Sequence, residues 1–197
     1  MWFPLYFMGD LMVESIKLYH FTHYTALRSI LRESTVRTGR FMDDSGNYRV
    51  GAVSFTTDVV ASPGHGLPDG RRLLGDDGDT LAHVNMINGD QYCINAGECL
   101  LGFVIPFSDP KLVSASKYYE NLPRSTVLDL ELSAYFPTRV MTMQDRSVGM
   151  QKLQKGEWEG KSPTWYYYLG DFVFKEFTLG FLNPDGEGYF QVAGNSR

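Results

Sequence analysis

The chain has 197 residues, of which 43% are hydrophobic and 14% aromatic, and its formal net charge is −5 at pH 7. This size and composition are typical of a globular domain with its own core, which argues against a disordered chain or a small disulfide-stapled scaffold. The acidic balance argues against an electrostatic grip on nucleic acid over a broad surface, although it leaves room for a small basic groove. We therefore expect a single domain over residues 1–197.

The first 14 residues are apolar, but their pattern does not predict a leader or an anchor. The segment lacks a basic start, and Asp10 and Glu14 interrupt it before a signal-peptide core or a membrane span is complete. Met8 and Met12 offer other starting points, so residues 1–14 are an extension or a misassigned start. We expect a cytoplasmic protein that does not contact a membrane.

Residues 17–22 predict a short apolar strand that carries His20 near its end. A buried strand normally excludes a titratable side chain unless a partner meets it, so His20 is either a satisfied core group or a group that faces a ligand. An amphipathic helix is predicted directly afterwards, with Thr22 or Thr25 as its N-cap. Its apolar residues recur at helical spacing: Ala26, Leu27, Ile30 and Leu31.

A second buried strand is predicted over residues 52–57, and it carries Ser54 and Thr56.

The long turn-rich stretch over residues 62–79 follows, and loops of this length are usually functional or disordered. Arg71 in this loop could reach a pyrophosphate group. The acidic residues of the loop match no calcium-binding spacing, so we expect no metal.

Cys93 and Cys99 are the two cysteines of the chain. They form either one hairpin disulfide or, as expected in a reducing compartment, two structural thiols. No histidine spacing accompanies them, which argues against zinc.

Three further strands are predicted over residues 100–106, 165–168 and 171–182, and the last of them ends at the turn of residues 183–186. Residues 127–136 and 139–143 fit either a helix or a strand. Strands therefore dominate, with one early helix. This pattern predicts an α+β domain built on twisted, mostly antiparallel sheets.

Glu176 lies within the apolar run of the last strand. Alternation places it on one face together with Phe172, Phe174 and Thr178. An ionised carboxylate is costly there unless a ligand or a partner meets it. We therefore interpret this face as the wall of a cleft.

The three polar positions, taken together, resemble the pattern of the ADP-ribosyltransferase superfamily. The order is a first-strand histidine before a helix (His20), a Ser/Thr-x-Ser/Thr element on a second strand (Ser54 and Thr56), and a glutamate late in the chain (Glu176). The first block is similar to that of the bacterial DNA-targeting toxin branch. The resemblance covers residues 16–182 and implies a fold of split, twisted sheets.

The resemblance also implies that NAD is the substrate. In the block of residues 20–22, His20 would bond a ribose hydroxyl and the Phe21 backbone would hold the nicotinamide amide, with Thr22 beside them. Arg71 is the candidate for the pyrophosphate.

The same resemblance gives roles to the other two elements. Ser54 and Thr56 would brace the nicotinamide side and orient Glu176. Glu176 would bond the 2′-hydroxyl of the nicotinamide ribose and stabilise the oxocarbenium ion as nicotinamide leaves. A preorganised carboxylate suits this step because the positive charge develops mainly in the transition state.

The acceptor of the ADP-ribose group stays open between DNA, RNA and protein. Arginine-directed members place Glu or Gln two positions before the catalytic glutamate, and this chain has Phe174 there. The polar loop of residues 155–164 offers Trp158 for stacking on an acceptor. The aromatic that stacks on nicotinamide is Tyr24, Phe55 or Tyr119.

Two alternatives accompany this interpretation. One is a non-catalytic module of the same fold that binds a nucleotide or a protein partner. The other is an NAD-dependent RNA 2′-phosphotransferase, which needs a basic cluster of which the sequence shows only Arg71 and Arg72 together with scattered arginines.

Overall fold

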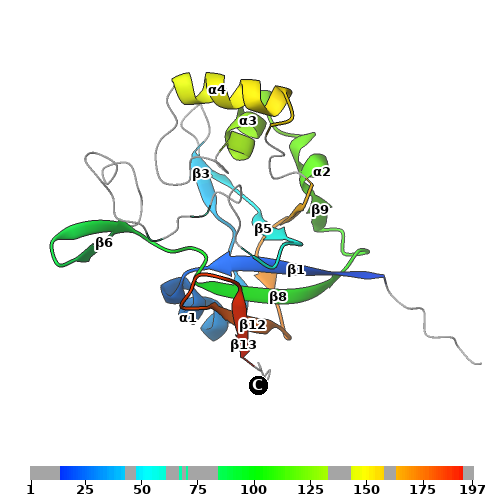
Figure 1. Ribbon diagram of the computed structural model, residues 1–197. Coiled ribbons are helices and arrows are strands. Elements are labelled where there is room, and N and C mark those ends of the chain that lie inside the picture. Colours follow the sequence, from blue (N-terminus) through cyan, green and yellow to red (C-terminus); the bar gives the residue numbers. More distant parts are fainter. Residues whose placement is uncertain are drawn as a thin grey trace, which may run out of the picture.

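The computed structural model (Figure 1) describes residues 14–42, 48–60, 67, 70, 84–132, 143–157 and 163–192. The helices are α1 Tyr24–Glu33, α2 Ala115–Tyr119, α3 Arg124–Leu132 and α4 Met143–Gln154. The strands are β1 Ser15–Thr22, β2 Thr35–Val36, β3 Arg40–Met42, β4 Tyr48–Val50, β5 Val53–Thr56, β6 Val84–Ile87, β7 Asp90–Cys93, β8 Cys99–Pro106, β9 Leu112–Ser114, β10 Trp165–Tyr168, β11 Phe172–Val173, β12 Thr178–Leu182 and β13 Tyr189–Val192. None of the helices in these ranges is long and apolar enough to cross a membrane.

A seven-stranded sheet with the order β13-β12-β8-β1-β5-β10-β9 forms the centre of the fold. Its pairings are antiparallel, and β1 lies between β8 and β5. Smaller two-stranded sheets pair β11 with β2, β3 with β4 and β6 with β7. The prediction of an α+β domain with mostly antiparallel sheets is confirmed, and so are the predicted strands at β1, β5, β8 and β10.

The strand register decides which side chains share a face of the large sheet. Tyr19 lies opposite Thr56, and residues that face each other across a pair point to the same side. Because successive residues alternate, His20 and Phe55 lie together on the other side, where their rings meet edge to face at 5.9 Å. We call this side, which carries His20 and Phe55, the α1 face, and the side that carries Ser54 and Thr56 the opposite face.

The α1 face holds the main hydrophobic core. Leu27 and Ile30 of α1 pack there against β1, β5 and β8. Phe172 of β11 joins them, with its ring 5.1 Å from that of Phe55 and 5.0 Å from that of Phe103. The small β11-β2 sheet therefore packs on the large one through aromatic contacts.

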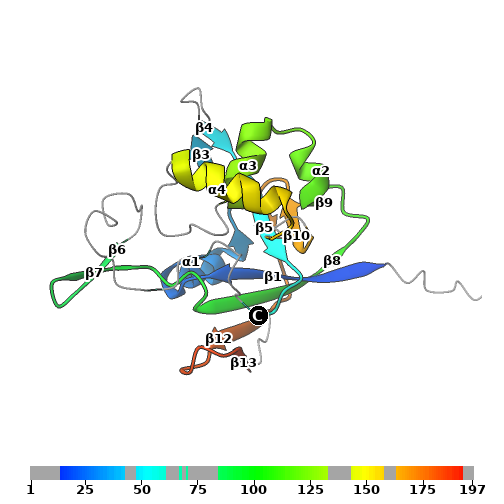
Figure 2. The same cartoon turned by 45° about the horizontal axis from the view of Figure 1, so that its top comes forward.

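A second cluster covers the opposite face near β10. Trp165 and Tyr167 pack there with Ala115 and the tyrosines of α2. In both Figure 1 and Figure 2, α3 and α4 lie above β5 and β10, and α1 lies below them beside β1. The helices thus cover both faces of the sheet, and of the helices in the described ranges α1 is the one that lies on the side of His20.

The N-cap of α1 is His23, so the prediction of Thr22 or Thr25 is wrong. The Nδ1 atom of His23 accepts a hydrogen bond from the backbone N–H of Ala26 at 3.4 Å, as a capping oxygen would. Thr22 instead ends β1, and Thr25 lies in the first turn. The helix ends at Ser34, which has a left-handed backbone with φ 48°.

The predicted strand over residues 171–182 is two strands with different partners. β11 pairs with β2, whereas β12 pairs with β8 in the large sheet. Between them, Phe174 is buried and its N–H donates to the carbonyl of Ser34 at 3.0 Å. The chain therefore passes from one sheet to another within a single apolar run. The hydrophobic periodicity of the sequence does not predict this change of partner.

Cys93 and Cys99 are both buried, and they are not joined to each other by a disulfide. The hairpin disulfide is therefore absent from the structure. Burial, together with the nearby Glu98 carboxylate, raises the pKa of the Cys99 thiol to about 11. The thiol form of Cys99 packs at the start of β8 as a small apolar side chain.

Candidate functional site

His20 is held by the neighbouring strand in a defined orientation. Its Nδ1 lies 3.0 Å from the carbonyl oxygen of Ser54, and because a carbonyl only accepts, we assign the proton to Nδ1. Desolvation by burial lowers the pKa of His20, and the bond to the Ser54 carbonyl opposes this only in part. The ring is therefore neutral at pH 7, and its Nε2 keeps a lone pair that can accept a hydrogen bond.

A groove of about 490 Å³ lies beside this ring, within the usual range for small-molecule sites. We call it the α1 groove, because a stripe of residues three or four apart on α1 forms one wall. From His23 to Glu33 this wall rises by ten residue steps, or roughly 15 Å along the helix axis. The described lining residues are His20, Thr22, His23, Thr25, Ala26, Ser29, Ile30, Glu33, Thr35, Val36 and Arg37.

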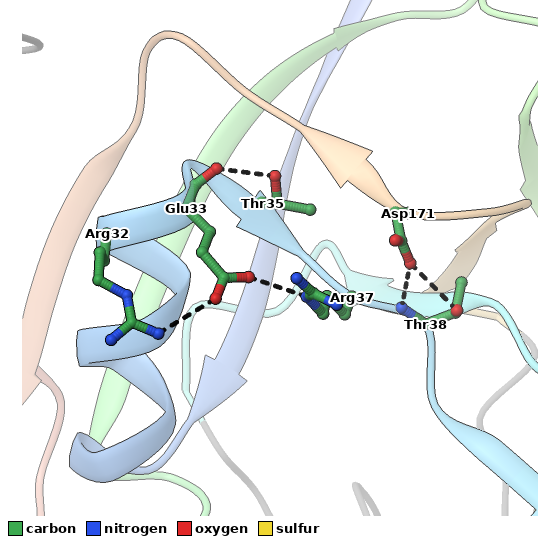
Figure 3. A network of polar contacts seen from close by, with 6 residues as sticks. All are labelled: Arg32, Glu33, Thr35, Arg37, Thr38 and Asp171. Atoms are coloured by element: carbon green, nitrogen blue, oxygen red, sulfur yellow. Dashed lines mark hydrogen bonds and ion pairs between the residues drawn. The ribbon is translucent and has the colours of Figure 1, made fainter.

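The far end of the α1 groove carries an ion-pair network (Figure 3). Nε of Arg37 donates to one oxygen of Glu33 at 2.8 Å, and Nη2 of Arg32 donates to the other at 3.2 Å. The hydrogen bond from Arg37, followed by that from Arg32, lowers the pKa of Glu33. Glu33 is therefore an ionised, oriented carboxylate at this end of the groove.

Asp171 ties the segment after β2 to the chain just before β11 (Figure 3). Its Oδ1 accepts from the backbone N–H of Thr38 at 2.8 Å and from the Thr38 hydroxyl at 3.1 Å. The hydrogen bond from the Thr38 backbone is the main cause of the lowered pKa of Asp171. These contacts fix the backbone that presents Arg37.

Two of the predicted NAD-contacting side chains, His20 and Thr22, line the same groove. Phe21 lies between them, so its side chain is on the opposite face, where it packs with Tyr19 and Leu100. The structure thus brings together the two polar members of the predicted first-strand block.

Ser54 and Thr56 do not join His20 through their side chains. Both side chains lie on the opposite face, and the contact to His20 comes from the Ser54 main chain. The Thr56 hydroxyl instead bonds Asp58, whose N–H donates to it at 3.1 Å. The expectation that Ser54 and Thr56 brace the nicotinamide side and orient Glu176 is not supported by the register of β1 and β5, which turns both side chains away from the α1 face.

Glu176 lies in the linker between β11 and β12, so its predicted place within a strand is wrong. Its side chain is exposed and does not line the α1 groove. Phe174 and Phe177, on either side, pack together with their rings 5.4 Å apart and take the inward positions of this linker. Within the described ranges, Glu176 has neither a hydrogen bond nor an ion pair.

Two predicted site residues, Arg71 and Trp158, lie outside the residues that the structure describes, as does the acidic cluster of the loop over residues 62–79. In the described ranges, no three histidine, cysteine or acidic side chains gather as metal ligands would.

The candidates for stacking on nicotinamide are dispersed. Phe55 is fully buried in the core, whereas Tyr24 is 57% exposed. Tyr119 belongs to the cluster on the opposite face, where its hydroxyl lies 3.2 Å from that of Tyr167 and burial raises the pKa of both phenols, that of Tyr167 to about 12. None of these three aromatic residues is among the described residues that line the α1 groove.

Glu33, Arg37, His23 and Ser29 line the groove without having been predicted as site residues. The helical spacing of His23, Ala26, Ile30 and Glu33 is visible in the sequence, but polar positions on such a stripe ordinarily face solvent. Their shared role depends on β2 folding back along α1, which no local pattern reveals.

The pH dependence of stability offers a check on the state of His20. Its pKa is lowered in the folded protein, so below about pH 6.5 the unfolded chain binds more protons than the native one. The free energy of unfolding is therefore expected to fall as the pH drops from 7 to 5, by at most about 1.4 kcal/mol per pH unit from this group. Urea unfolding of the wild type and of His20→Asn at each pH measures it. An equally steep fall in the variant would contradict the assignment.

Comparison with known proteins adds no relative: no protein-family model, curated protein or solved structure matches the chain.

Proposed function

We propose that this protein binds NAD in the α1 groove and transfers its ADP-ribose group to a macromolecular acceptor. The observation that supports this most directly is the neutral His20 imidazole, oriented by the Ser54 carbonyl at the edge of a groove of about 490 Å³. Ribose hydroxyls are donors, and the free lone pair of His20 Nε2 is a matching acceptor. The nearly buried hydroxyl of Thr22 supplies a second polar contact beside it.

In the proposed reaction, the bond between C1′ of the ribose and the nicotinamide nitrogen breaks. Nicotinamide leaves with the bonding electron pair, and a nucleophile of the acceptor forms the new bond to C1′. The acceptor is a nucleic-acid base or a protein side chain, and its displaced proton passes to solvent. NAD is consumed as a substrate, and the scheme uses no metal.

Glu176 belongs to this proposal as the carboxylate that stabilises the cationic ribose. Its support is the sequence resemblance, because its exposed side chain is not among the described residues that line the α1 groove. Ser54 acts through its carbonyl, which fixes the tautomer of His20.

A matched substitution tests the binding step. His20→Asn places an amide N–H near the position of Nδ1 and so keeps a donor for the Ser54 carbonyl, but it removes the Nε2 acceptor. We expect the variant to bind NAD and ADP-ribose roughly tenfold more weakly, since a buried acceptor that bonds a ligand hydroxyl contributes about 1–1.5 kcal/mol. Isothermal titration calorimetry measures both ligands, and thermal unfolding verifies that the variant is folded. Equal affinities of the two proteins would remove His20 from the site.

The second candidate function is a non-catalytic nucleotide-binding module. The exposure of Glu176 outside the groove favours it, because such a module needs the groove but no catalytic carboxylate. NAD and ADP-ribose would then both raise the melting temperature, while nicotinamide would not accumulate. Chromatography of the reaction mixture, with oligonucleotides and cell extract as acceptors, decides between the two.

A further inference from the structure

We propose that Arg37 is a phosphate-binding residue at the far end of the α1 groove, so that the groove takes a phosphorylated nucleoside with its ribose toward His20. For NAD as the ligand, this rests on the proposed function. For simpler nucleotides it stands on the groove alone.

The two ends of the groove differ in chemistry. Near β1, His20 and Thr22 offer an uncharged acceptor and a hydroxyl. At the other end of α1, roughly 15 Å along the helix axis from its N-cap His23, Glu33 and Arg37 carry full charges. Of the described residues that line the groove, Arg37 is the one permanent cation. An extended ligand with a nucleoside at one end and an anionic group at the other matches this polarity.

The Arg37 guanidinium is both oriented and available. Its Nε is used by Glu33, which fixes the plane of the group. A guanidinium has five N–H donors, and no other residue of the described ranges bonds the four on its terminal nitrogens. The side chain is 72% exposed, so a ligand can reach it. Two parallel N–H groups in a fixed plane fit two oxygens of a phosphate group.

The charges around Arg37 nearly cancel, so a phosphate at this end of the groove would be held by directed hydrogen bonds more than by net charge. Arg32 and Arg37 face the carboxylate of Glu33, and Arg37 also lowers the pKa of Asp171 through its charge. Two cations and two anions therefore balance at this end. The benefit of Arg37 to a phosphate comes from directed hydrogen bonds, and at an exposed site we expect about a tenfold effect on affinity.

Arg32 supplies a matched control. It bonds the other oxygen of the same Glu33 carboxylate and is equally exposed, at 74%, but it does not line the groove. Arg32→Gln and Arg37→Gln each remove one positive charge and one bond to Glu33. Only the second removes a donor from the groove.

The experiment is calorimetric titration of adenosine, AMP and NAD into the wild type and both variants, with thermal unfolding to verify folding. We expect Arg37→Gln to weaken AMP and NAD roughly tenfold and adenosine less than about twofold, and Arg32→Gln to change each by less than about twofold. Arg37→Lys, which keeps the charge but loses the planar fork, is expected to fall between. Equal effects of the two Gln variants, or an equal loss for adenosine and AMP, would overturn the assignment.

The same titrations separate this inference from the proposed function. If the wild type binds NAD but Arg37→Gln behaves like Arg32→Gln, the phosphate site fails and NAD binding stands. If the wild type prefers AMP to adenosine through Arg37 but does not bind NAD, the phosphate site stands and the proposed function fails. If none of the three ligands binds, both fail.

Discussion

Nicotinamide release from NAD is expected to fall by roughly two to four powers of ten when Glu176 is replaced by glutamine. Departure of nicotinamide leaves positive charge on the ribose, and under the transfer proposal the Glu176 carboxylate stabilises that charge. Glutamine keeps the shape and the hydrogen-bonding oxygen but carries no charge. The loss should therefore appear in the rate of release, with the affinity for NAD changed far less.

The surroundings of Glu176 indicate that the Glu176→Gln substitution leaves the fold unchanged. The side chain is exposed and has no hydrogen-bond or ion-pair partner within the described ranges, so the fold does not depend on its charge. Phe174 and Phe177 hold the linker in place on both sides. The Glu176 carboxylate is not used by the described part of the fold, so its charge can be removed without breaking an observed contact.

Glu187→Gln is the matched control. Glu187 is an exposed carboxylate in the turn between β12 and β13. The Glu187→Gln variant should release nicotinamide at the wild-type rate. Chromatographic measurement of nicotinamide in the three proteins decides the matter. Unchanged release in Glu176→Gln would exclude this glutamate from the reaction, and an absence of release in the wild type under all acceptor conditions would favour the binding module.

Phe55→Ala is expected to lower the free energy of unfolding by about 3–5 kcal/mol. Phe55 is 0% exposed and lies on β5 at the centre of the α1 face. Its ring contacts those of Phe103 at 5.8 Å and Phe172 at 5.1 Å, and it lies 5.9 Å from the His20 ring. Alanine would leave a cavity between the large sheet and the β11-β2 pair, and it would also remove the surface that supports His20.

Urea denaturation monitored by circular dichroism measures this loss. Val173→Ala serves as the control, because Val173 is 71% exposed on the neighbouring strand β11 and should change stability by about 0.5 kcal/mol or less. Phe55→Leu, which retains more of the volume, should lie between the two. A loss below about 1 kcal/mol in Phe55→Ala would show that the aromatic cluster does not hold the two sheets together.

The elements that the sequence predicts correctly are those whose signal is local. The apolar run of β8 and the helical spacing in α1 depend only on neighbouring residues, because a strand buried on both faces is continuously apolar and a surface helix repeats its apolar side chains. The strand with His20 was predicted on the same grounds. These segments form the frame of the candidate site.

The sequence also places Ser54 and Thr56 correctly on a strand, but it predicts neither the pairing of that strand with β1 nor the side to which the two side chains point. That depends on the pairing of Tyr19 with Thr56, since a shift of one residue would move both hydroxyls to the α1 face. Register is set by the packing of both faces against distant segments. No pattern within β5 alone contains it.

What the sequence by itself determined is therefore the four strands β1, β5, β8 and β10, the early helix and the presence of a titratable residue near the end of β1. Tertiary structure decided that Glu176 leaves the sheet, because the chain there changes partner from β2 to β8. It also decided that Glu33 and Arg37 share a groove with His20, because β2 returns along α1. The physical reason is that hydrophobic periodicity is encoded over a few neighbouring residues, whereas partner choice depends on surfaces that come together only when the whole chain has folded.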